Sequence, residues 1–393
     1  MQLPNHPLTH LTYCLNVHPG ETLAEQSAAI REHAVAIRDL VAPGARFGLG
    51  LRVAQLASLE LEDTDKRREL RELLQSQGMY AFTINGFPYG SFHGATVKQA
   101  VYRPDWREPA RTEYTCRLAR LLAELLPEGM TGSISTLPGS YKAWIRSADD
   151  VNAMVAQLAT TAACLARLQD ETGREIHLGL EPEPDCFLET TAETLAFFRD
   201  QIWPCGARWL VSQHGGSLAT AEALLRRHIG VCFDTCHLAL QYENLAESLR
   251  DLAQSGIRLS KIQLSAALRT CWQPGSAAAL QPFTESIYLH QVKVREQGRI
   301  ISLGDLVDAT GAGRAGQEWR VHCHVPLYFR GEGVLETTAD LLDPAFFQEV
   351  RARQVEHLEI ETYTFHVLPE ALRRLGVDRS IAEEYCWILP RLA

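Results

Sequence analysis

Polar side chains occur at the ends of several short, apolar, β-like segments in the second half of the chain. They are Glu181, Asp234, Gln263 and Glu361, in the segments His177–Glu183, Gly230–His237, Lys261–Leu264 and His357–Tyr363. Successive side chains of a strand point to opposite faces, so a polar group can lie opposite its apolar neighbours. Carboxylates that converge would repel one another, and a divalent cation removes that repulsion. The pattern predicts a metal site formed by these four residues.

Histidines occur close to the same segments. His237 follows Asp234 by three residues, and His322 and His324 share one face of the segment Val321–Val325. Oxygen ligands suit Mg²⁺ or Mn²⁺, whereas imidazole moves the preference toward Mn²⁺, Zn²⁺ or Fe²⁺. Two roles stay open for these three histidines, namely ligands of a second metal ion or contacts to a substrate.

Candidate substrate contacts come from the first half of the chain. Three polar residues lie near the ends of early β-like segments, and the loop 86–107 is rich in glycine, proline and aromatic residues. Such a loop is typical of a lid or pocket wall, although a rigid packing loop is the alternative. The predicted substrate-binding residues are Asn16, Arg52, Asn85, Phe87, Tyr89 and His93.

Short β-like segments alternate with longer helical patterns along the whole chain, which indicates a parallel sheet with crossover helices. Eight to nine such strands favour a closed (β/α)₈ TIM barrel, an α/β fold, whose active sites lie at the carboxyl ends of the strands. Residues 265–318 show no clear periodicity and are predicted to be an insertion within a single barrel that spans residues 1–393. The expected strands cover 11–16, 47–52, 80–85, 132–136, 176–181, 229–234, 259–264, 319–325 and 357–363.

Composition narrows the classes of partner and compartment. The 393 residues include 38 basic and 48 acidic ones, a net charge of −10, which disfavours nucleic acid as a partner. No basic, apolar leader begins the chain and no long uncharged apolar run occurs, so we expect a cytoplasmic protein without a membrane span. Zinc–thiolate binding at Cys232, Cys236 or Cys323 is disfavoured because the usual ligand spacings are missing.

The strand-end motifs resemble those of the xylose isomerase-like TIM barrel superfamily, which includes sugar isomerases and epimerases. The motifs are Leu180-Glu181-Pro182, the segment 233–237, Gln263 and Ile360-Glu361. Longer segments, at residues 11–21, 82–90, 102–106 and 132–136, resemble the EboE family of metabolite-traffic proteins within that superfamily.

The resemblance implies roles for individual residues. Glu181, Asp234 and Glu361 match the acidic metal ligands of the superfamily, and Gln263 stands where many relatives carry histidine. His237 matches a substrate contact or second-metal ligand. His322 and His324 are similar to a pair that binds additional metal in the endonuclease-like branch, with His322 in the place of an acid.

Three functions remain open at this stage. The first is an isomerase or epimerase of a small polyhydroxylated or hydroxyketone metabolite, with Glu181 and Glu361 as catalytic acid and base and Mn, Mg or Zn as cofactor. The second is a non-catalytic protein that binds a metabolite for trafficking or export. The third, disfavoured by the charge and by His322, is an endonuclease IV-like phosphodiesterase. Expected partners are a small-molecule metabolite and other ebo-cluster proteins, and a homo-oligomer is left open.

Overall fold

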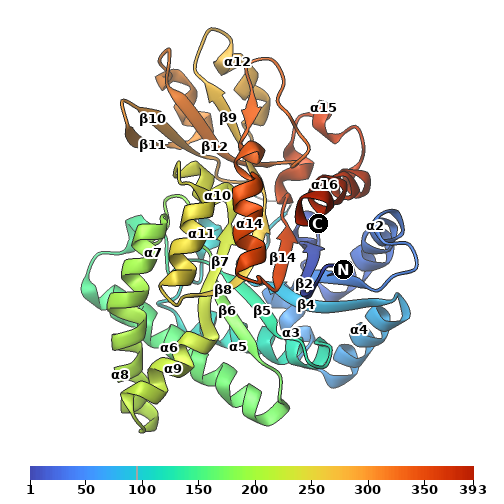
Figure 1. Cartoon of the computed structure of the whole chain (residues 1–393), viewed down its shortest axis with the longest axis vertical. Coiled ribbons are helices and arrows are strands. Elements are labelled where there is room, and N and C mark those ends of the chain that lie inside the picture. The colour runs from blue at the N-terminus through green and yellow to red at the C-terminus, as the bar shows by residue number, and fades with distance from the viewer. Residues whose placement is uncertain (94–95) are drawn as a thin grey trace.

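The computed structural model describes residues 1–93 and 96–393 and contains a nine-stranded sheet that curves into a nearly closed barrel (Figure 1). Its strand order is β1-β2-β14-β8-β7-β6-β5-β4-β3, and all strands except β1 run parallel. The strands are β1 (Gln2–Leu3), β2 (His6–Tyr13), β3 (Phe47–Arg52), β4 (Met79–Asn85), β5 (Gly132–Thr136), β6 (Ile176–Leu180), β7 (Ile229–Asp234), β8 (Arg258–Leu264) and β14 (His357–Ile360).

The barrel closes between β2 and β3. The Thr12 hydroxyl accepts a hydrogen bond from the Gly50 N–H at 2.8 Å and donates one to the Gly48 carbonyl at 3.0 Å. A Cβ atom at Gly50 would lie 2.1 Å from the Glu359 carboxylate, so this position has no room for a side chain. The predicted (β/α)₈ fold is therefore confirmed, with glycine required where the two edge strands meet.

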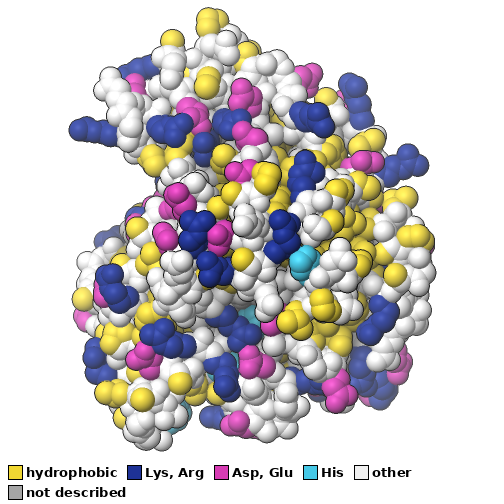
Figure 2. Space-filling view, in the orientation of Figure 1, with side chains coloured by type: hydrophobic (Ala, Val, Ile, Leu, Met, Phe, Trp, Pro, Cys, Tyr) yellow, Lys and Arg dark blue, Asp and Glu magenta, His cyan; other side chains and the backbone are white. Residues whose placement is uncertain are grey.

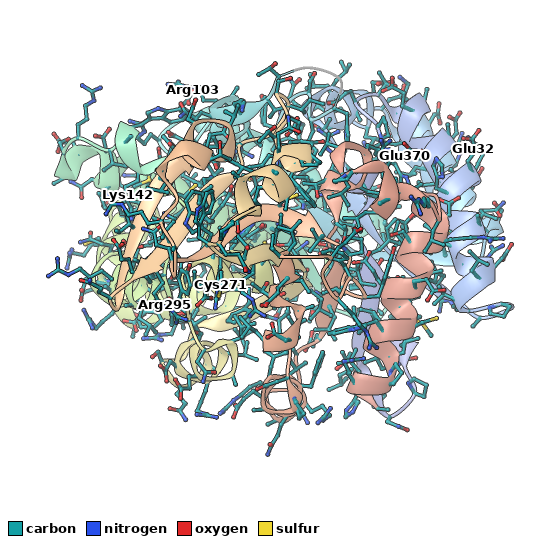
Figure 3. All side chains as sticks on the ribbon, turned by 90° about the horizontal axis from the view of Figure 1, so that it is seen from above. Glu32, Arg103, Lys142, Cys271, Arg295 and Glu370 are labelled. Atoms are coloured by element: carbon teal, nitrogen blue, oxygen red, sulfur yellow. The ribbon has the colours of Figure 1, made fainter. Side chains whose placement is uncertain are left out.

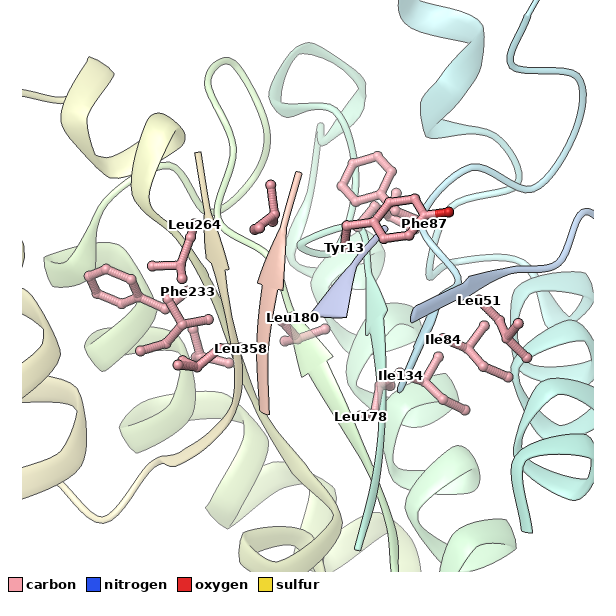
Figure 4. Packing of buried hydrophobic residues seen from close by; sticks show 14 of the residues in the cluster. Tyr13, Leu51, Ile84, Phe87, Ile134, Leu178, Leu180, Phe233, Leu264 and Leu358 are labelled. Atoms are coloured by element: carbon pink, nitrogen blue, oxygen red, sulfur yellow. The ribbon is translucent and has the colours of Figure 1, made fainter. Parts of the chain in front are cut away.

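Helices cover the outside of the barrel (Figure 1). Outward-facing strand residues such as Ile84, Ile134 and Leu178, labelled in Figure 4, are buried beneath them. The larger helices are α1 (Leu23–Ala29), α2 (Val35–Val41), α3 (Gln55–Glu60), α4 (Thr64–Ser76), α5 (Pro109–Leu125), α6 (Ala148–Thr172), α7 (Thr191–Phe197), α8 (Trp203–His214), α9 (Leu218–His228), α10 (Thr235–Leu240), α11 (Leu245–Gln254), α14 (Pro344–Ala352) and α16 (Val377–Leu392).

Helix α6 is the one helix, within residues 1–93 and 96–393, that is long and apolar enough to cross a membrane. Its residues Leu158, Ala162 and Leu165 are fully buried, and the helix contacts α5, α8 and β6. Packing in the outer layer of the barrel therefore accounts for its apolar composition.

On the face shown in Figure 2, basic and acidic side chains are interspersed.

A second, antiparallel sheet lies above the barrel in Figure 1, in the order β11-β10-β12-β9-β13. The predicted insertion 265–318 contributes the first three strands of this sheet along the chain, β9, β10 and β11. The segment 319–325, expected among the barrel strands, instead forms β12, because it hydrogen-bonds to β9 and β10. The strands are β9 (Ala266–Cys271), β10 (Gln291–Glu296), β11 (Arg299–Asp305), β12 (Glu318–Val325) and β13 (Glu336–Thr337).

Polar side chains fill the barrel near the starts of its strands. The rings of His177 and His357 stack with centroids 5.6 Å apart, and the His357 Nδ1 lies 2.8 Å from the Ser133 hydroxyl. Lys261 and Glu359 form an ion pair in which both side chains are fully buried. Burial lowers the pKa of both histidines well below the usual range, so the imidazoles are neutral in the folded protein.

The buried, neutral imidazoles of His177 and His357 predict that the folded protein loses stability in mild acid. An unfolded histidine binds a proton near pH 6.5, whereas His177 and His357 resist it when folded, so the free energy of unfolding must fall as the pH drops below about 6.5. The expected slope is up to about 1.4 kcal/mol per pH unit for each buried imidazole. Urea denaturation between pH 8 and 5.5 measures it. His357→Gln should make the free energy of unfolding depend less steeply on pH, whereas the control His214→Gln, at an exposed position, should leave this slope unchanged. An equal free energy of unfolding at both pH limits would contradict this account.

Candidate metal centre and cavity

The four predicted metal-site residues come from adjacent strands. Glu181 follows β6, Asp234 ends β7, Gln263 lies in β8 and Glu361 follows β14, and β6, β7, β8 and β14 are consecutive neighbours in the barrel. Ligand oxygens of Glu181, Asp234 and Glu361 all lie within 4.8 Å of one another, and all three residues are buried. The structure thus brings the predicted carboxylates together at the mouth of the barrel.

These carboxylates lack the neutralising partners that buried acids normally have. The pKa of Glu181 is raised well above its usual range by burial and then by the charges of Asp234 and Glu183. Burial, followed by the charges of Glu181 and Asp234, raises the pKa of Glu361. Among the described residues, Glu181 Oε2 and Asp234 Oδ2 have no hydrogen-bond partner. Unpaired, converging oxygens of this kind fit a divalent cation.

Local structure orients Asp234 and Glu361. Asp234 is the N-cap of α10, where its Oδ1 accepts hydrogen bonds from the His237 N–H at 3.0 Å and the Ser265 hydroxyl at 2.8 Å. Glu361 Oε1 accepts hydrogen bonds from the side-chain amides of Asn16 at 2.9 Å and Asn85 at 2.7 Å. Each acid therefore has one oxygen held by the protein, and the second remains for a ligand.

Gln263 fits the amide-ligand role predicted for it. Its Oε1 accepts a hydrogen bond from the Cys232 thiol at 3.0 Å, while its Nε2 has no partner among the residues that the structure describes. Amide oxygen and nitrogen are interchangeable by a 180° rotation, and the thiol can accept as well as donate. The rotated amide would satisfy Cys232 and leave its oxygen available to a cation.

Each of the three site histidines has its Nδ1 beside an oxygen acceptor. His237 lies 3.1 Å from the Pro182 carbonyl, and His324 lies 2.7 Å from the Glu361 carbonyl. His322 lies 2.7 Å from the Gln291 side-chain oxygen. Donation from Nδ1 fixes the tautomer, so that the lone pair is on Nε2, as in most metal-bound histidines.

The Nε2 atoms of His322 and His324 are only 3.3 Å apart, which brings two acceptor nitrogens together. His237 and His324 also form a group with Asp234 whose ligand atoms lie within 4.8 Å of one another. Cys236 forms a similar group with His322 and His324. Asp234 is thus shared between an all-carboxylate group and an imidazole group, which is the arrangement a second cation requires.

The predicted substrate-binding residues divide into two sets. Asn16, Asn85 and Phe87 line a cavity directly above the carboxylates, whereas Tyr89 and His93 are not among its lining residues. Arg52 is also outside the lining. Its guanidinium donates to the carbonyls of Gly20 at 2.9 Å and Gly90 at 2.6 Å and pairs with Glu21, so it anchors loops.

The cavity has a volume of about 50 Å³, which is room for roughly three to five water molecules. Several lining residues were not predicted from the sequence: Lys98, Val101, Tyr102, Glu183, Tyr288, Leu289 and Tyr363. Glu183 stands two residues after Glu181 on the same alternating segment, and this spacing is the local signal that could have identified it. Burial raises the pKa of Glu183 to about 8, and its Oε1 accepts a hydrogen bond from the Tyr102 hydroxyl at 2.8 Å.

The carboxylate cluster predicts that metal-free protein is stabilised by removing one charge. Ionisation of Glu181 is opposed in the folded state, so its contribution to stability is present below pH 4.5 and is lost as the pH rises through its elevated pKa. Glu181→Gln should therefore raise the melting temperature of chelator-treated protein at pH 8 by about 2 °C or more. Calorimetry measures the shift, with the exposed Glu32→Gln as control (Figure 3). A lower melting temperature for Glu181→Gln would contradict the repulsion.

The chain is similar to several solved structures at low sequence identity. No protein-family profile and no curated protein sequence matches the chain. Similar solved structures include the IOLI protein with a binding zinc atom (11% identity, covering 97% of this chain and 98% of that one, TM-score 0.49). A probable 3-DHS dehydratase, AsbF from Bacillus anthracis (12%, 97% and 98%, 0.47), and a xylose isomerase domain protein from Alicyclobacillus acidocaldarius (12%, 97% and 98%, 0.47) are also similar. Structures described as xylose isomerase domain proteins are thus among those to which this chain is similar.

Proposed function

We propose that this protein is a divalent-metal-dependent isomerase or epimerase of a small hydroxy-carbonyl metabolite. The observation that supports the proposal is the convergence of Glu181, Asp234 and Glu361 within 4.8 Å beneath a small cavity. Glu181, Asp234, Gln263 and Glu361 would hold the cation, which we expect to be Mn²⁺, Mg²⁺ or Zn²⁺. When bound, it would stabilise negative charge that develops on the substrate oxygens.

The protein's own residues supply the proton transfer. Glu181 follows β6 and Glu361 follows β14, and both line the cavity. One carboxylate would remove a proton from the hydroxyl-bearing carbon next to the carbonyl, and the other carboxyl group, in its protonated form, would deliver its own proton to the former carbonyl carbon. The hydroxyl proton would pass to the former carbonyl oxygen, so that the carbonyl and hydroxyl groups exchange places.

The surrounding residues keep these groups in place. Asn16 and Asn85 both donate to Glu361 Oε1, which directs its other oxygen away from them. The His237 ring has its Nδ1 at 3.8 Å from Glu181 Oε1, and its Nε2 is free to contact a substrate oxygen. Burial lowers the pKa of His237 well below its usual range, so the ring acts as a neutral imidazole.

A second candidate function is metabolite binding without turnover, as in the EboE type of metabolite-traffic protein. The observation that favours it is that the segments resembling the EboE family supply much of the cavity. Asn16, Asn85, Phe87 and Tyr102 all belong to those segments and all line it. Such a protein would use the same pocket to hold its ligand for a partner, and its carboxylates would fix a cation without moving protons.

Solvent-deuterium exchange tests the proposed reaction. Metal-loaded protein in D₂O with hydroxyacetone, dihydroxyacetone or erythrulose should incorporate deuterium next to the carbonyl of at least one of them, as followed by NMR. Glu181→Gln and Glu361→Gln should each slow the exchange by about 10²–10⁴-fold, the usual worth of a general acid or base. Glu32→Gln should leave it unchanged.

The outcomes separate the two functions. Exchange that persists in both glutamine variants would contradict the assigned catalytic roles. Thermal stabilisation of the protein by one of these ketones, with no exchange above the protein-free rate, would favour the binding protein over the isomerase.

A further inference from the structure

We propose that the ligand of this site is unphosphorylated and amphipathic, with an oxygen-bearing end at the carboxylates and a small apolar body against the cavity wall. The inference rests on the proposed function, because it takes the carboxylate cluster to be the place where the oxygens bind. It specifies the class of substrate among the many small hydroxy-carbonyl compounds.

The wall of the cavity above the carboxylates is apolar and comes from three parts of the chain. Phe87 and Pro88 follow β4, Val101 belongs to the short helix η3 (Lys98–Tyr102), and Leu289 precedes β10 of the second sheet. A polyol would have to leave its outer hydroxyl groups against these side chains without hydrogen bonds, which costs free energy. An alkyl group gains by the same contact.

An aromatic cluster completes this wall. The ring centroids of Phe92, Tyr288 and Tyr363 lie 5.2–5.3 Å from one another, and all three residues line the cavity. The Tyr363 hydroxyl lies 3.4 Å from His322 Nε2, at the polar end of the cavity. The wall therefore changes from polar to apolar with distance from the carboxylates.

The Tyr102 hydroxyl, which lines the cavity, already has hydrogen-bond partners. The Tyr102 hydroxyl donates to Glu183 and accepts a hydrogen bond from the Gln291 amide at 3.0 Å. The same amide donates to the Pro184 carbonyl at 3.0 Å, and its oxygen faces His322. This network crosses from the barrel to the second sheet and leaves no spare donor in it for an additional substrate hydroxyl.

The charges around the cavity oppose a phosphate group. Among the described lining residues, the only lysine or arginine is Lys98, and its ammonium group is paired with Asp305. Arg103, at the edge of the molecule in Figure 3, is not one of the lining residues. Its guanidinium carbon lies 4.3 Å from the centroid of the Trp144 ring. A phosphate would instead meet the carboxylates of Glu181, Asp234 and Glu361, and the described lining offers it no arginine fork or unpaired lysine.

Three hydroxamates test the inference, because each carries the same pair of chelating oxygens. Acetohydroxamate has a methyl group, isovalerohydroxamate adds three apolar carbons, and phosphoglycolohydroxamate adds a phosphate. Calorimetric titration of the full-length, Mn²⁺-loaded protein gives the three dissociation constants. One buried methylene is worth about fourfold in affinity, so isovalerohydroxamate should bind at least about 10-fold tighter than acetohydroxamate. Phosphoglycolohydroxamate should bind no tighter than acetohydroxamate.

A pair of variants locates the effect. Leu289→Ala, in the cavity wall, should reduce the advantage of isovalerohydroxamate about threefold or more and leave acetohydroxamate unchanged. Ile301→Ala, on an exposed strand of the same sheet, should change neither.

The results distinguish this inference from the function on which it rests. If acetohydroxamate binds but the phosphate compound binds tighter, or if all three bind equally, the substrate class is wrong while the metal centre stands. If none of the three binds, the metal-centred function itself is contradicted, and this inference with it.

Discussion

The burial of three carboxylates in one place is the constraint on which the rest of this structure depends. Glu181, Asp234 and Glu361 are each nearly inaccessible to solvent, and their oxygens lie within 4.8 Å of one another. Desolvated like charges raise each other's pKa and destabilise the folded state unless a cation or a proton compensates. A protein with such a cluster has lower stability in the metal-free state, and the same concentration of negative charge attracts a cation to the site.

The architecture serves to hold these groups against their repulsion. Parallel strands bring the residues to one end of the barrel. The side-chain amides of Asn16 and Asn85 hold Glu361, and the N-cap position of α10 holds Asp234. Backbone carbonyls orient His237 and His324. The second sheet then covers this end, and its β12 adds His322 and His324 to the site. Chemistry at the base of the cavity and selectivity at its wall thus come from different parts of the chain.

Much of the barrel and its acidic residues could be predicted from local sequence. Glu181, Asp234 and Glu361 stand out because an ionisable group in an apolar β-like segment needs a reason to be there. The contacts of Arg52 could not be predicted in this way, because its partners Gly20, Glu21 and Gly90 belong to loops that no periodicity places.

Long-range contacts explain the other differences. The segment 319–325 has the pattern of any buried strand, and only its pairing with β9 and β10 assigns it to the second sheet. Gln291 and Leu289 carry no local signal of function, and Tyr102 is indicated only as part of the loop 86–107. They meet Glu183 and His322 because the second sheet folds over the barrel, which spacing along the chain does not reveal.

The most direct test is a crystal structure of the protein soaked with Mn²⁺, with anomalous scattering to locate the metal. The account predicts an anomalous peak within about 2.0–2.4 Å of oxygens from Glu181, Asp234 and Glu361, with the Gln263 amide oxygen turned toward it. A fully soaked crystal with no peak among these residues, or with its peak elsewhere, would contradict the central claim.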